Sequence, residues 1–76
     1  MSNWEEIGEG YFSYTSGSWS LYLRVDDSGA ILEVYDGTSL ITTNKWGPAI
    51  ASLPAGEDWC KKQSLKCLEQ EQKKRF

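Results

Sequence analysis

The sequence contains no histidine, and it has only two cysteines and two prolines. The missing histidine removes the commonest general base and the commonest metal ligand, and two cysteines fall short of any structural zinc set. The glycine-rich patterns of a P-loop or a dinucleotide-binding turn do not occur either. We therefore expect a protein that is not an enzyme, with no catalytic residues, no cofactor and no metal site.

Long hydrophobic runs are also missing. No stretch approaches the ~20 apolar residues that span a membrane, and the acidic start of the sequence lacks the basic and apolar regions of a signal peptide. These features predict a soluble, cytoplasmic protein without a membrane partner. The cysteines agree with a reducing compartment. On one helix, Cys60 and Cys67 would lie about 10.5 Å apart along the axis, and a disulfide needs Cα atoms within about 7 Å.

The chain of 76 residues predicts one small domain, residues 1–76, with a net charge of −3 that is unevenly distributed. Residues 1–60 contain nine acids and two bases, whereas residues 61–76 contain six bases and two acids. A nucleic-acid binder normally carries a basic main surface, so nucleic acid is not expected as a direct ligand. The basic residues near the C-terminus have a structural explanation, because cations at the end of a helix complement its dipole.

Residues 10–45 predict a β-meander of four strands. The clearest strand, Trp19 to Val25, alternates apolar and polar residues with a period of two. The other strands are predicted at about 10–15, 30–35 and 39–45, with turns at 16–17, 26–29 and 36–37. Residues 46–56 hold two glycines and two prolines and indicate a connector, with Ile50 and Leu53 under the helix. Helix formers dominate residues 57–74.

The three turns agree on one apolar face, and a slip of one residue would scramble it. The predicted opposed pairs are Val25–Ala30, Leu23–Leu32, Leu21–Val34, Tyr14–Trp19, Phe12–Leu21 and Ile41–Leu32. A three-residue loop at the last hairpin would instead bring Leu40 into the core. The helix has an apolar arc to bury against this face, formed by Trp59, Cys60, Cys67 and Leu68. The predicted fold is therefore α+β, a four-stranded antiparallel β-meander (β-β-β-β-α) with one C-terminal helix packed on one face.

The same registers place tyrosines on the face that the helix leaves open, with Tyr11 opposite Tyr22 and Tyr35 opposite Ser20. Tyrosine and arginine are enriched in protein interfaces. Two other interpretations remain open: aromatic pairs that only stabilise the sheet, by roughly 0.2–1 kcal/mol each, and burial of this face in a homodimer. Trp46 is a further candidate, because tryptophan contributes heavily to interfaces. The predicted partner-binding residues are Tyr11, Tyr22, Arg24, Glu33, Tyr35 and Trp46.

These observations favour a small non-enzymatic protein-binding module, monomeric or homodimeric. An acidic, tyrosine-bearing face suits a regulator or inhibitor that docks on a larger partner, such as a nucleic-acid-handling protein, and a phage or accessory gene would suit such a product. The alternative is a dimeric protein that binds single-stranded nucleic acid on the open sheet. Its basis is the order of four strands and a helix, which is similar to that of the single-stranded-DNA-binding transcriptional coactivators. A structural subunit is the third hypothesis.

Overall fold

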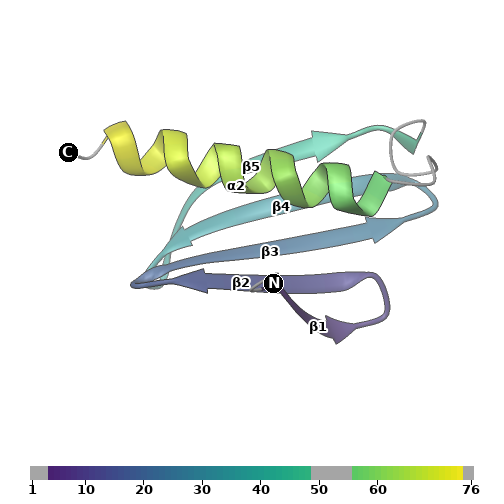
Figure 1. Cartoon of the computed structure of the whole chain (residues 1–76), viewed down its shortest axis with the longest axis horizontal. Helices are drawn as coiled ribbons and strands as arrows, with labels where there is room; N and C mark the ends of the chain where they lie inside the picture. Colours follow the sequence, from purple (N-terminus) through teal and green to yellow (C-terminus); the bar gives the residue numbers. More distant parts are fainter. Residues whose placement is uncertain (1–3, 49–55, 75–76) are drawn as a thin grey trace.

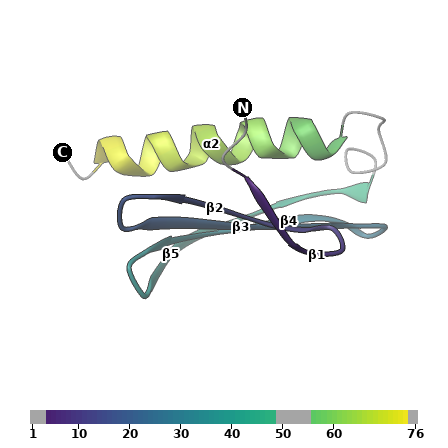
Figure 2. The ribbon, with the colours of Figure 1, turned by 60° about the horizontal axis from the view of Figure 1, so that its bottom comes forward.

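The computed structural model describes residues 4–48 and 56–74 and contains five antiparallel strands, of which the third and fourth show the clearest alternation of apolar and polar residues. The strands lie in the order of the chain, and the helix α2 (Gly56–Lys74) follows them (Figure 1). The elements are β1 (Glu5–Gly8), β2 (Tyr11–Ser16), β3 (Trp19–Asp26), β4 (Gly29–Asp36), β5 (Ser39–Trp46) and α2 (Gly56–Lys74). Figure 2 shows α2 on one side of the sheet, with none of the described elements on the other side. The predicted α+β fold with an antiparallel sheet and one C-terminal helix is thus confirmed.

The sheet has five strands rather than the predicted four, because β1 precedes the meander. Its sequence, Glu-Glu-Ile-Gly, shows no alternation, and all four residues are exposed. β1 pairs with β2 through a bulge between Glu6 and Gly8. The signal that could have revealed it is the turn at Glu9-Gly10, where Gly10 takes a φ of 67°.

The predicted register between β3 and β4 is confirmed at every pair. Leu21, Leu23 and Val25 face Val34, Leu32 and Ala30, respectively. The turn between the strands is held by Asp26, whose Oδ1 accepts hydrogen bonds from the backbone N–H and the hydroxyl of Ser28, at 2.8 and 2.6 Å. Asparagine and aspartate side chains favour turns by making this kind of local bond.

The predicted register between β2 and β3 is wrong by two residues, although the faces are right. Phe12 lies opposite Leu23 and Tyr14 opposite Leu21. The turn consists of Gly17 and Ser18, with Gly17 at a φ of 61° and no positive φ at any described residue other than glycine. Glycine at the first position of a two-residue turn is the type II′ arrangement. A shift of two residues preserves the side on which each side chain lies.

The predicted pairing of β5 is also wrong, because Asn44 and not Ile41 lies opposite Leu32. The turn is formed by Gly37 and Thr38, and a bulge interrupts the register between Val34 and Tyr35. The bulge adds a residue to β5, so Leu40 lies opposite Tyr35 while Thr42 lies opposite Val34. Leu40 is 51% exposed, so the alternative with Leu40 in the core is wrong too. Ile41 still packs partly against the core.

The core lies between the sheet and α2, which packs on β3 and β4. Its buried apolar residues are Phe12, Trp19, Leu21, Leu23, Ala30, Leu32, Val34, Cys60 and Leu68. The helix contributes Cys60 and Leu68 as predicted, and also the buried Ser64, whose hydroxyl donates to the carbonyl of Cys60 at 2.7 Å. The prediction that Trp59 is a core residue is wrong: it is 37% exposed, with its ring at the edge of Trp46.

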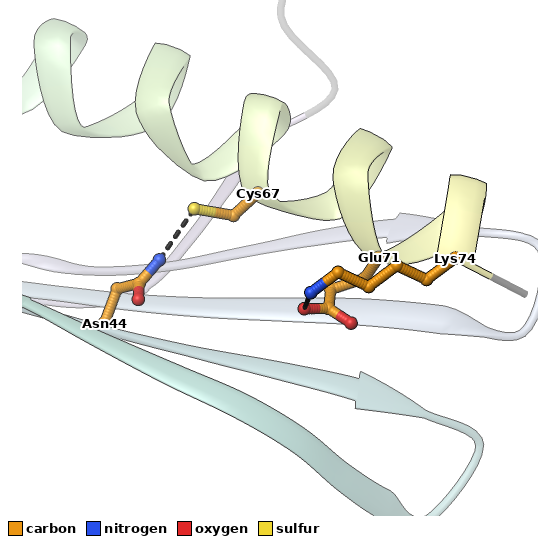
Figure 3. A network of polar contacts seen from close by, with 4 residues as sticks. All are labelled: Asn44, Cys67, Glu71 and Lys74. Atoms are coloured by element: carbon orange, nitrogen blue, oxygen red, sulfur yellow. Dashed lines mark hydrogen bonds and ion pairs between the residues drawn. The ribbon is translucent and has the colours of Figure 1, made fainter.

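The boundary between α2 and β5 is partly polar (Figure 3). The amide Nδ2 of Asn44 donates to the Sγ of Cys67 at 2.7 Å, and one turn further on Glu71 pairs with Lys74 at 3.2 Å. Both cysteines are free thiols. Burial raises the pKa of both thiols; at Cys67 the Asn44 hydrogen bond opposes this effect and the charge of Glu71 adds to it.

Part of the predicted connector, including Ile50 and Leu53, lies outside the described residues. The helix begins at Gly56, one residue before the predicted start, and its terminal charges follow the helix dipole. Glu57 and Asp58 lie in its first turn, and Lys73 and Lys74 lie in its last turn. Within the described part of the chain, no helix is long and apolar enough to cross a membrane.

Candidate functional site

The three central strands β2, β3 and β4 place a group of large side chains on the side of the sheet opposite α2. Successive residues of a strand point to opposite faces, so the strand positions next to core residues form this group. We call it the tyrosine face, and its members are Tyr11, Tyr22, Arg24, Ile31, Glu33 and Tyr35. Five of the six predicted partner-binding residues therefore lie together.

The tyrosines form a diagonal across the three strands. The ring centroids of Tyr11 and Tyr22 are 6.4 Å apart and their planes cross at 72°, while Tyr22 and Tyr35 are 5.6 Å apart at 83°. Both pairs are edge-to-face contacts, the arrangement that the charge distribution of aromatic rings favours. The prediction that Tyr11 lies directly opposite Tyr22 is wrong, because Tyr11 lies opposite Arg24; the two tyrosines contact each other diagonally.

One cation and one anion are held among these rings. The guanidinium carbon of Arg24 lies 4.8 Å from the centroid of the Tyr11 ring. Glu33 lies opposite Tyr22, and its Oε2 accepts a hydrogen bond of 3.5 Å from the hydroxyl of Tyr35. The pKa of the Tyr35 hydroxyl is raised, mainly by partial burial and secondly by the nearby negative charge of Glu33. Tyr35 therefore keeps its proton and remains a donor at neutral pH.

The flanking strands add residues to this face that the sequence did not indicate. On β5, Leu40 lies opposite Tyr35 and Lys45 opposite Ile31. On β1, Glu5 lies opposite Ser13. Ile31 and Leu40 are 43% and 51% exposed, so the face carries apolar surface as well as charge. Lys45 was missed because its side of the sheet depends on the bulge in β5, which has no clear sequence signal, whereas Leu40 lies before the bulge and its side is set by the Gly37-Thr38 turn.

Two adjoining hollows indent the tyrosine face. One, of about 240 Å³, is lined by Tyr11, Tyr22, Arg24, Ile31 and Glu33. The other, of about 340 Å³, is lined by Tyr11, Ser20, Tyr22, Glu33, Tyr35, Gly37 and Thr38. Tyr11, Tyr22 and Glu33 border both hollows, so a single partner side chain in either would touch the centre of the face.

Trp46, the sixth predicted partner-binding residue, lies elsewhere. It ends β5 opposite Ala30, on the side of the sheet that carries α2. Its ring meets that of Trp59 edge-on, with the centroids 6.0 Å apart. The structure therefore separates Trp46 from the tyrosine face.

The face presents aromatic rings together with one guanidinium and one carboxylate. Among residues 4–48 and 56–74, no three histidine, cysteine, aspartate or glutamate side chains gather as metal ligands would. Both thiols belong to α2, on the other side of the sheet. In comparisons with protein-family models, with curated proteins and with solved structures, the chain matches none of them.

Proposed function

We propose that the protein is a small, non-enzymatic protein-binding module whose partner is recognised by the tyrosine face. The observation that carries this proposal is the tyrosine diagonal of Tyr11, Tyr22 and Tyr35 on a sheet face that none of the described elements covers. Tyrosine provides a large contact area with few rotatable bonds, so little conformational entropy is lost on binding. The half-exposed Ile31 and Leu40 extend the apolar part of the contact.

The charge of the chain favours a basic partner. Acids exceed bases by seven over residues 1–60, and Asp26, Asp27 and Asp36 lie at the ends of the strands that form the face. Such charges increase the rate of association with a basic surface. A regulator or inhibitor that docks on the basic surface of a nucleic-acid-handling protein agrees with this distribution, and we retain a phage or accessory gene as the proposed source.

Affinity capture from native lysate tests the proposal, with the immobilised protein compared with its Y22A Y35A double variant. We expect the native protein to capture a partner protein from lysate both with and without nuclease treatment, and the double variant to lose it. The matched control is L65A, which removes an exposed apolar side chain from α2. Capture that survives in the double variant and is lost in L65A would place the partner site on the helix and contradict the proposal.

The alternative function is binding of single-stranded nucleic acid by a dimer. It is supported by the exposed tyrosine rings, on which bases can stack, and by Arg24 and Lys45, which flank Ile31 in one row of the sheet. Glu33 and Glu5 lie in the adjacent row, opposite Tyr22 and Ser13. A protein partner therefore remains the first proposal, since a binding groove for nucleic acid needs a basic track.

A further inference from the structure

The larger hollow of the tyrosine face has one acidic residue in its lining and no described base. That acid is Glu33. Tyr22 lies opposite it on β3, and Tyr35 follows it by two residues on β4, so phenol rings flank the carboxylate along the strand and across it.

Glu33 has no cationic partner within residues 4–48 and 56–74. The ion pairs of these residues all lie on α2, from Lys61–Glu57 to Lys74–Glu71. The carboxylate of Glu33 accepts the 3.5 Å hydrogen bond from Tyr35. An ionised carboxylate has about four acceptor positions, so Glu33 can accept further hydrogen bonds from a ligand.

The tyrosines of this face already hold one guanidinium, that of Arg24 at 4.8 Å from the Tyr11 centroid. The negative face of an aromatic ring attracts a cation, and arginine is the usual partner. Arg24 lines the smaller hollow and not the larger one. The larger hollow therefore offers aromatic rings and a carboxylate to a cation from outside.

We propose that this hollow receives an arginine or lysine side chain from a basic segment of the partner protein. Glu33 pairs with the cation, and Tyr22 and Tyr35 form the walls around its stem. This inference rests on the proposed function and specifies the chemistry of the partner. The acid excess of residues 1–60 attracts such a segment, and the hollow selects a cationic side chain from it.

The test is a titration of the isotope-labelled protein with the peptide acetyl-Gly-Gly-Arg-Gly-Gly-amide, followed by NMR. The matched probe carries citrulline, which keeps the shape of arginine without its charge. We expect the arginine peptide to shift the resonances of Tyr22, Glu33 and Tyr35, and to bind about tenfold more tightly than the citrulline peptide, since charge and cation–π contacts are lost together. Equal binding of the two peptides, or shifts confined to other residues, would overturn the inference.

A pair of variants assigns the effect to Glu33. E33Q retains the shape of the side chain and removes its charge, and it should reduce the preference for arginine over citrulline to the part that the tyrosine rings contribute. D27N removes the same charge from an exposed turn and should preserve that preference. If capture of the protein partner requires Tyr22 but is unchanged in E33Q, the proposed function stands and the cation site is rejected. If neither Y22A nor E33Q loses capture of the partner, both the proposed function and the cation site are rejected.

Discussion

Leu23 on β3 lies directly across from Leu32 on β4, and neither side chain is accessible to solvent. One residue before, Tyr22 lies across from Glu33 on the opposite side of the same two strands. Adjacent residues of one strand thus belong to the core and to the tyrosine face, which allows the two roles to be tested separately.

L23A should destabilise the fold by about 2–5 kcal/mol, because it removes buried methyl groups and leaves a cavity. This is a large part of the stability of so small a domain. Thermal or denaturant unfolding measures the change. A loss below about 0.5 kcal/mol, the usual range for a surface substitution, would contradict the central position of Leu23.

Y22A should change the free energy of unfolding by only about 1 kcal/mol or less, the scale of a cross-strand pair on an open sheet. If Tyr22 is a hot spot, the same substitution should weaken the complex with the partner by about 2 kcal/mol or more. Melting curves and a binding titration on Y22A and L23A give the comparison. An unfolded Y22A protein, or one with unchanged affinity for its partner, would refute the assignment.

G29A should destabilise the protein by more than about 1 kcal/mol, because a side chain is placed where the native backbone excludes it. Gly29 has a φ of 131°, and a Cβ there would collide with the carbonyl oxygen of Trp46. Two matched variants separate the causes in the same unfolding assay. G17A adds a Cβ at a φ of 61° in open space, and G47A adds one in open space without a positive φ. The expected order of destabilisation is G29A, then G17A, then G47A.

Both thiols should react slowly with a thiol reagent in the folded protein. Burial raises their pKa values above the usual 9.0, so the reactive thiolate forms only at higher pH. Labelling should therefore accelerate as the pH rises beyond 9.0. The single-cysteine variants C60A and C67S separate the two sites: Cys67, which is half-buried, should react before the fully buried Cys60. Rapid labelling of both below pH 8 would contradict the predicted slow reaction, and faster labelling of Cys60 than of Cys67 would contradict the order.

Affinity for single-stranded DNA should be weak at physiological salt and should fall steeply as salt rises, because phosphate neutralisation dominates non-specific binding. Arg24 and Lys45 are the bases of residues 1–60. A fluorescence titration with a labelled oligonucleotide measures the affinity. Tight binding at physiological salt, retained after deletion of residues 73–76, would make the nucleic-acid hypothesis the better one.

The sequence predicts the β3–β4 hairpin well because its turn signal is unambiguous and both strands alternate cleanly. At the two neighbouring hairpins, Gly17 and Gly37 occupy the first and not the second turn position. For β2 the register shifts by two residues, an even number, so each side chain stays on the predicted face of the sheet. For β5 the additional bulge changes the alternation, and no simple pattern of residues identifies a bulge in advance.

The limits of sequence reasoning are similar at the candidate site. Tyr11, Tyr22 and Tyr35 are found because strand parity fixes their side of the sheet. Trp46 was grouped with them on residue type alone, and the structure places it beside Trp59. The buried position of Ser64 is not indicated by its residue type, because serine is polar. Its hydroxyl can be buried because it donates a hydrogen bond to the Cys60 carbonyl of the same helix.

Strand parity also divides the molecule into two sets of positions that can vary independently. The backbone of β3 and β4 separates the buried positions from the outward ones, so a substitution in one set leaves the packing of the other set unchanged. A combinatorial library restricted to outward positions should therefore yield new binding specificities on a constant scaffold. Suitable positions are Ser20, Tyr22, Arg24, Ile31, Glu33 and Tyr35. By the same reasoning, natural variants of this chain can acquire new partners while the leucines beneath the face stay the same.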